Sequence, residues 1–158
     1  MFHVVLVSPE IPPNTGNIIR LCANTGCTLH LVEPLGFKLD DKRLIRAGLD
    51  YHEFASLQLH NNWAVCESRL RAIGVKQFWA LTTKGTQSPY SIKFNKNDAL
   101  VFGSETRGLP LEVLECIQQE HRLRLPMIPQ QRSLNLSNAT AVVIYEAWRQ
   151  LHFEGAVI

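Results

Sequence analysis

The stretch RLRLPMIPQQRSLNLSNATAVVIYEAW, residues 122–148, joins a short alternating run to a polar turn and then to an unusually apolar segment. Residues 122–127 begin with alternating basic and apolar side chains, which is typical of a strand, and Pro126 and Pro129 then end any sheet ladder. Good helix formers without Gly or Pro follow, so the sequence predicts a helix over residues 136–151. We expect the functional site at the turn between them.

The predicted C-terminal helix is apolar on more than one face. A helix of this kind is buried against its own sheet and against something else. We therefore expect a homodimer, with Tyr145 and Trp148 as candidate interface residues, although either could equally belong to the core. The apolar residues at helical spacing are Leu136, Ala139, Val142, Val143, Ala147 and Leu151, and those on the other face are Ala141, Ile144, Tyr145 and Trp148.

Four short polar residues precede or open this helix within six positions: Ser133, Asn135, Ser137 and Asn138. Any one of them is explained by capping, because such side chains satisfy N–H groups that lack a partner at a helix start. Four in six positions is more than a cap needs. This excess indicates that the turn also binds something.

Length and composition indicate one ordinary domain. With 158 residues, of which 46% are hydrophobic and 19% charged, the chain can bury a core, and no repeat or linker divides it, so we expect a single domain over residues 1–158. The longest apolar runs fall far short of the ~18 residues that suggest a membrane span. The four cysteines lack C-x-x-C spacing and no secretory signal is recognisable, which predicts reduced thiols in the cytoplasm.

The formal net charge is only +2, which argues against a large basic surface for nucleic acid. Any RNA-binding surface must therefore be local. Basic clusters of this size most often form a solvated face, and RNA contact remains the alternative. The clusters are Lys42, Arg43 and Arg46; Arg69, Arg71 and Lys76; and Arg122, Arg124 and Arg132.

Strand-like and helix-like segments alternate along the chain. Most predicted strands are apolar throughout, which is typical of strands buried on both faces. The pattern predicts an α/β fold with a parallel sheet of five or six strands and helices on both faces. Predicted strands are residues 2–7, 28–32, 77–82, 99–102 and 122–127, with an ambiguous one near 54–59; predicted helices are 18–24, 42–47, 62–73, 110–117 and 136–151; residues 12–17 and 84–96 are predicted loops.

Several common catalytic signatures are absent from the sequence. There is no G-x-G-x-x-G after a strand, no G-x-x-x-x-G-K-[ST], no G-x-S-x-G and no H-E-x-x-H. The six histidines show no metal-ligand spacing, so we expect no metal site.

Three segments, each directly after a predicted strand, together resemble one family. Residues 14–20 (NTGNIIR), 100–110 (LVFGSETRGLP) and 133–138 (SLNLSN) resemble the motifs N-x-G-N-I-x-R, F-G-x-E-x-x-G-L-P and S-x-N-x-S-N of the SPOUT superfamily of RNA 2′-O-ribose methyltransferases. The likeness runs nearly end to end and is greatest to the small single-domain branch that acts on nucleotide 34 of tRNA. Leu134 stands where that branch usually has Met, a residue of similar volume.

This resemblance implies a C-terminal trefoil knot, a homodimer and S-adenosylmethionine as cofactor, without a metal and with S-adenosylhomocysteine as product. It implies 2′-O-methylation of the wobble ribose in the tRNA anticodon stem-loop, in leucine isoacceptors. Two alternatives are a methyltransferase of the same fold acting on another RNA, such as rRNA, and a non-catalytic RNA-binding module.

The resemblance also implies roles for individual residues. Arg20 is implied to be catalytic, either as general base or, since a guanidinium with a pKa above ~12 stays charged, by binding the flanking phosphate and the developing alkoxide. Asn14, Glu105 and Asn138 would orient it. We expect glycine at position 103 to let backbone approach the cofactor, so that Gly103→Val would block the pocket and leave the fold intact. The implied cofactor-binding residues are Leu81, Thr82, Gly103, Glu105, Gly108, Leu125, Ile128, Ser133, Leu134 and Ser137.

Overall fold

A computed structural model describes residues 1–40, 42 and 57–157. Its centre is a six-stranded sheet in the order β3-β2-β1-β5-β4-β6, and every strand pairing is parallel. The strands are β1 (His3–Val7), β2 (Thr28–Val32), β3 (Leu57–His60), β4 (Phe78–Leu81), β5 (Ala99–Phe102) and β6 (Arg122–Leu123). The predicted parallel sheet is confirmed.

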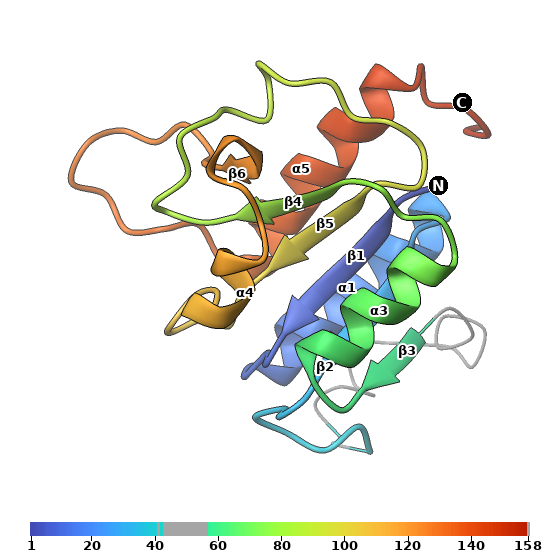
Figure 1. Cartoon of the computed structure of the whole chain (residues 1–158), viewed down its shortest axis with the longest axis vertical. Coiled ribbons are helices and arrows are strands. Elements are labelled where there is room, and N and C mark those ends of the chain that lie inside the picture. The colour runs from blue at the N-terminus through green and yellow to red at the C-terminus, as the bar shows by residue number, and fades with distance from the viewer. Residues whose placement is uncertain (41, 43–56, 158) are drawn as a thin grey trace.

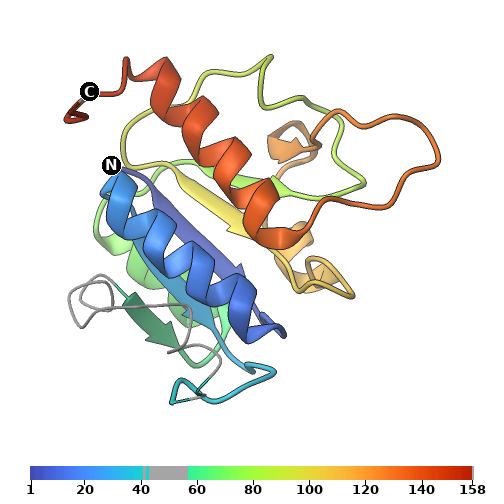
Figure 2. The same ribbon diagram turned by 180° about the vertical axis from the view of Figure 1, so that it is seen from behind.

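Helices cover both faces of this sheet, as predicted. α1 (Pro12–Thr25) and α5 (Leu136–Gln150) lie side by side on one face (Figure 2). α3 (Trp63–Ala72) and α4 (Leu111–Glu115) pack on the other face (Figure 1), and the 3-10 turn η2 (Gln119–His121) leads into β6. Each face has its own buried apolar cluster. None of the described helices is long and apolar enough to cross a membrane.

The first helix begins earlier than the sequence predicted. Residues 12–17 were expected to form a loop, but Pro12 and Pro13 occupy the first helical turn of α1. A helix accepts proline there because its first N–H groups have no partner within the helix. The predicted end is confirmed, since Gly26 caps the helix in the left-handed conformation with a φ of 68°.

The strand predicted for residues 122–127 is shorter than expected, because only Arg122 and Leu123 pair with β4. Beyond them the chain bonds to the loop after β4, with the Arg124 N–H donating to the Gln87 carbonyl at 2.8 Å. Pro110 is the N-cap of α4 rather than its first helical residue. The predicted helix at 42–47, apart from residue 42, and the part of the ambiguous strand before residue 57 lie outside the described residues.

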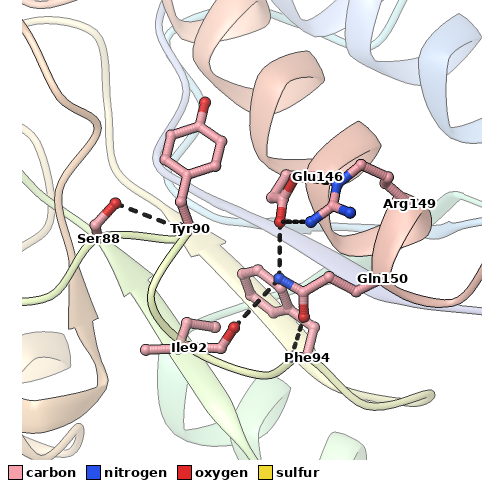
Figure 3. A network of polar contacts seen from close by, with 7 residues as sticks. All are labelled: Ser88, Tyr90, Ile92, Phe94, Glu146, Arg149 and Gln150. Atoms are coloured by element: carbon pink, nitrogen blue, oxygen red, sulfur yellow. Dashed lines mark hydrogen bonds and ion pairs between the residues drawn. The ribbon is translucent and has the colours of Figure 1, made fainter.

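The end of α5 holds the loop that follows β4 (Figure 3). The Gln150 side chain accepts from the Phe94 N–H at 2.9 Å and donates to the Ile92 carbonyl at 3.2 Å and to Glu146 at 2.8 Å. Glu146 is buried, and its hydrogen bond from Arg149 lowers the pKa of the carboxyl. Residues 92–94 are thereby fixed against a helix more than 50 positions away in the chain.

Three histidines form a buried relay across β1, β2 and β3. The rings of His3 and His30 approach to 3.0 Å, and those of His30 and His60 to 2.9 Å, between ring nitrogens. Burial lowers the pKa of all three rings, and that of His30 to about 3, with the neighbouring rings adding to the shift. Near neutral pH this relay is uncharged.

Candidate active site

A cavity of about 460 Å³ opens at the carboxyl ends of β4, β5 and β6. This is the edge at which open α/β sheets usually bind ligands. Loops after all three strands line the cavity, together with the starts of α1 and α5. The lining includes residues 81–84, 102–109, 123–125 and 133–136, with Ile11, Asn14, Leu114, Met127 and Ala139.

Glu105 ties the loop after β5 to the start of α1. Its carboxylate accepts hydrogen bonds from the backbone N–H groups of Glu10 at 2.7 Å and Ile11 at 3.1 Å, and from the Asn14 side-chain amide at 3.1 Å. Ile11 is the N-cap of α1 and offers no side-chain acceptor. The Glu105 carboxylate therefore holds the two residues that lead into α1, at the helix end where a negative charge is favourable.

Asn14 also links the start of α1 to the start of α5. Its side-chain oxygen accepts a hydrogen bond from the Asn135 amide at 2.9 Å. Asn135 is the N-cap of α5, where its own oxygen accepts from the backbone N–H of Ser137 at 2.9 Å. Glu105, Asn14 and Asn135 thus form one hydrogen-bonded chain that joins the three motif segments at the cavity.

The structure places Asn135, rather than Asn138, beside Asn14. Asn138 is exposed and does not line the cavity, and Ser137 also lies outside the lining, where its hydroxyl donates to the Asn135 oxygen at 2.7 Å. Sequence reasoning counted Asn135 among the polar residues of the motif but assigned it no role of its own at the site. Its central place in the S-x-N-x-S-N motif was the signal that could have identified it.

Eight of the ten expected cofactor-binding residues line the cavity, and Ile128 and Ser137 do not. Ile128 lies in the loop between β6 and α5 with 75% of its surface exposed, while the neighbouring Met127 reaches the cavity. The eight that line it are Leu81, Thr82, Gly103, Glu105, Gly108, Leu125, Ser133 and Leu134.

The expectation that Gly103→Val would leave the fold intact was wrong. A Cβ at position 103 would lie 2.0 Å from the Gly108 carbonyl carbon and 2.1 Å from the Leu109 nitrogen. Both are backbone atoms of the same loop, which closes on itself through hydrogen bonds between Ser104 and Gly108. Any side chain at position 103 therefore disturbs this loop directly, so Gly103→Val would not leave the fold intact.

Arg20 lies on the exposed surface of α1 and does not line the cavity. It follows Asn14 by six residues, which places it about 9 Å further along the helix and about 240° around it. Within one protomer, the structure therefore separates Arg20 from the hydrogen-bonded chain of Glu105, Asn14 and Asn135.

Parallel strands gather histidines that the sequence shows as scattered. One ring nitrogen each of His30 and His60 and the Cys66 sulfur lie within 4.8 Å of one another, all buried under α3. The facing nitrogens of the two rings already hydrogen-bond to each other, and none of the three residues lines the cavity. Spacing along the sequence could not have revealed this cluster, because its members come from β2, β3 and α3.

A model of the SpoU rRNA methylase family matches residues 1–145. The chain belongs to this family. The resemblance of the three motif segments to RNA methyltransferases is thus confirmed.

A curated SpoU relative and two solved structures are close to this chain. The tRNA (cytidine(34)-2′-O)-methyltransferase of Methylovorus glucosotrophus is 60% identical over 157 residues, which cover 99% of this chain and 100% of that protein. A structure described as giving insight into the 2-OH methylation of C/U34 on tRNA is 44% identical, with a TM-score of 0.88 and 98% of both chains covered. An AdoMet-bound rRNA methyltransferase from Sinorhizobium meliloti is 28% identical, with a TM-score of 0.82 and 95% of this chain and 56% of that one covered.

Proposed function

We propose that this protein transfers a methyl group from S-adenosylmethionine to the ribose 2′-hydroxyl of nucleotide 34 in tRNA. The observation that carries the proposal is the meeting of three motif segments at one cavity, through the chain of Glu105, Asn14 and Asn135. A 60% identical relative named for that reaction supports tRNA over rRNA as the substrate. Intact motif residues argue against a non-catalytic module.

The cavity fits a cofactor of this kind in size and chemistry. Its volume, about 460 Å³, lies within the usual range for small-molecule sites. Its lining combines the apolar residues Leu81, Leu125 and Leu134 with hydroxyl-bearing residues of the same loops, a mixture suited to an adenine ring and a ribose. When bound there, S-adenosylmethionine supplies an electrophilic methyl group on a sulfonium.

The reaction is an in-line displacement in which the ribose oxygen forms a bond to the methyl carbon while the carbon–sulfur bond breaks. The hydroxyl proton passes to solvent water, and S-adenosylhomocysteine is the product. Glu105 is poorly placed to take this proton, because three N–H donors already occupy its carboxylate. We propose that Glu105 and Asn14 position the loops at the cavity. We propose that Arg20 stabilises the negative charge that develops on the ribose oxygen.

A homodimer accounts for the position of Arg20. Arg20 lies outside the cavity of its own protomer, so a second protomer packed against α1 and α5 would carry its Arg20 to the neighbouring cavity. Tyr145 is 48% exposed on α5 and suits that contact, as does Val142 on the same helix. Trp148 is only 8% exposed and donates to the Glu154 carbonyl, so of the two candidate interface residues it belongs to the core.

We further propose that the C-terminal third is threaded as a trefoil knot within a single domain that acts in the cytoplasm. The loop after β4 lies so close to β6 that a Cβ at Gly85 would lie 2.4 Å from the Leu123 carbonyl carbon. The same loop is then bonded to the end of α5 through Gln150. Two contacts of one loop with the last strand and the last helix support such threading.

Methyl transfer to defined RNA tests the proposal. The protein is incubated with labelled S-adenosylmethionine and separate transcripts of leucine tRNAs, other tRNAs and rRNA, and the labelled nucleotide is mapped. Label confined to nucleotide 34 is the expected result, and a 2′-deoxy substitution at that nucleotide should abolish it. Label only in rRNA, or in no RNA, would contradict the proposal.

A further inference from the structure

Three cationic side chains surround the mouth of the cavity. Lys84 follows β4, Arg107 lies in the loop after β5, and Arg124 follows β6. All three residues are exposed and all three line the cavity. We refer to them as the cationic rim. Each comes from a different loop, so their convergence is a product of the fold that no single stretch of sequence displays.

The rim is not neutralised by the protein around it. Among the described residues, no hydrogen bond or ion pair is made by the charged groups of these three side chains, whereas Arg71, Lys96 and Arg149 each pair with a glutamate. The one carboxylate in the lining, Glu105, is taken up by its three N–H donors. Three cations against one carboxylate give the lining a formal charge of +2.

Neighbouring basic residues do not share this situation. Arg122 is two positions from Arg124, yet its guanidinium donates to the Leu114 carbonyl at 2.6 Å and to the Ile117 carbonyl at 3.0 Å. It therefore holds the segment before β6 to α4. Of the three arginines in this basic cluster of the sequence, Arg122 is structural and Arg124 belongs to the rim, while Arg132 is exposed and does not line the cavity.

The charge of the cofactor strengthens the case for an anionic partner. S-adenosylmethionine carries a sulfonium and an ammonium against one carboxylate, so binding it makes the cavity still more positive. A polyanion arriving at the mouth relieves this repulsion. Arginine suits that partner, because its planar fork matches two phosphate oxygens, and lysine adds a point charge.

We propose that Lys84, Arg107 and Arg124 bind the RNA phosphates that flank the target nucleotide and so position its ribose at the cavity. This inference rests on the proposed function for the identity of the reacting nucleotide. The rim itself needs only a single-stranded RNA backbone. It also reconciles RNA binding with a net charge of only +2, since the useful charge is concentrated where the reaction takes place.

Salt dependence of RNA binding tests the rim directly. The affinity for an anticodon stem-loop and for an unrelated single-stranded RNA is measured from 50 to 300 mM salt, with Lys84→Gln, Arg107→Gln, Arg124→Gln and the triple variant. Each lost phosphate contact should reduce the slope of log affinity against log salt by ~0.7, and the triple variant should lose about 2. Affinity for S-adenosylmethionine, measured on the same variants, should change by much less than affinity for RNA.

Matched controls are Lys93→Gln and Arg69→Gln, which remove exposed cations that do not line the cavity. Both should keep the parental salt slope. Rim variants with an unchanged slope would overturn the proposal, as would a loss of cofactor affinity equal to the loss of RNA affinity. The unrelated RNA tests the rim without depending on nucleotide 34. If the proposed function were wrong but the rim proposal right, the rim variants would still change the salt slope for this RNA, so the two failures can be told apart.

Discussion

The two halves of the sheet differ in where their polar side chains lie and what those side chains bond to. In β1, β2 and β3, the buried rings of His3, His30 and His60 hydrogen-bond to one another, and of their ring nitrogens only Nδ1 of His60 lacks a partner among the described residues. At the ends of β5, β4 and β6, polar and charged groups face a cavity, and the cations at its mouth lack partners among the described residues. The mutually bonded histidines stabilise the first half of the sheet, which we call the closed half. The polar and charged groups that face the cavity leave the second half, the open half, able to bind a ligand.

Arg20 should affect chemistry without affecting cofactor binding, because it lies outside the cavity lining. Arg20→Ala is expected to lower turnover by ~10²-fold or more and to leave the affinity for S-adenosylmethionine unchanged. Arg20→Lys keeps the charge but loses the planar fork, so rescue by lysine would indicate charge stabilisation, and no rescue would indicate bidentate positioning or the general-base role.

The control for Arg20 is Arg69→Ala, an exposed arginine on α3, which should retain parental turnover. Single-turnover methylation of tRNA and calorimetry with the cofactor are the two measurements. An Arg20→Ala protein that methylates at the parental rate would show that Arg20 merely covers a helix surface.

Gly103→Ala should destabilise the loop after β5, because the new side chain would clash with the backbone of that loop. The added Cβ would meet the Gly108 and Leu109 backbone at about 2 Å, so we expect a loss of about 2 kcal/mol in the free energy of unfolding, together with weakened cofactor binding. Gly108→Ala is the matched control. Its Cβ would meet nothing within 4 Å, and only its φ of 68° is unfavourable, which costs about 1 kcal/mol. Equal losses in thermal denaturation would contradict this account of the loop.

Lower pH should destabilise the closed half. The histidines of the relay have lower pKa values in the folded protein than the usual 6.5, so the unfolded chain binds protons first as the pH falls. Their stabilising contribution is present above about pH 6.5 and is lost progressively toward lower pH, by up to about 1.4 kcal/mol per pH unit for each ring. Between pH 7.5 and 5.5 few carboxylates titrate, which isolates the effect.

Urea denaturation at several pH values measures this slope. His30→Gln should flatten it, whereas His152→Gln, a change at an exposed position, should not. An identical slope in both variants would mean that the relay is not the group that responds to acid.

Asn135 and Asn138 distinguish the motif residue from its neighbour. Asn135→Ala removes both the cap of α5 and the hydrogen bond to Asn14, so we expect a loss of about 1 kcal/mol in stability and about tenfold in turnover. Asn138→Ala should change turnover by less than about twofold, because Asn138 does not line the cavity. The opposite ranking in paired kinetic assays would restore Asn138 to the orienting role that the sequence motif suggested.

The sequence predicted the fold better than it predicted the site. Apolar runs of strand length revealed β1, β2 and β5 because parallel strands are buried on both faces, and Gly26 revealed the end of α1. The start of α1 was missed because proline is read as a helix breaker, although it is tolerated in the first turn. Residues whose roles come from long-range contacts were the hardest to predict.

Asn135, Arg124 and the histidine relay illustrate that difficulty. Asn135 looked like a local cap, and its bond to Asn14 spans 121 positions. Arg122 and Arg124 look equivalent in the sequence, but in the structure Arg124 lies at the cavity and Arg122 bonds to α4. His30 and His60 became neighbours only through parallel pairing of β2 and β3. Local patterns carry no information on such pairings.

Hydrogen–deuterium exchange with and without S-adenosylhomocysteine tests the division between the two halves most directly. We predict slower exchange on ligand binding in residues 81–84, 102–109, 123–127 and 133–136, which surround the cavity, and no change in β3 or α3. Protection confined to β3 and α3, or no protection at any of these segments at saturating ligand, would contradict the assignment of the cavity as the cofactor site.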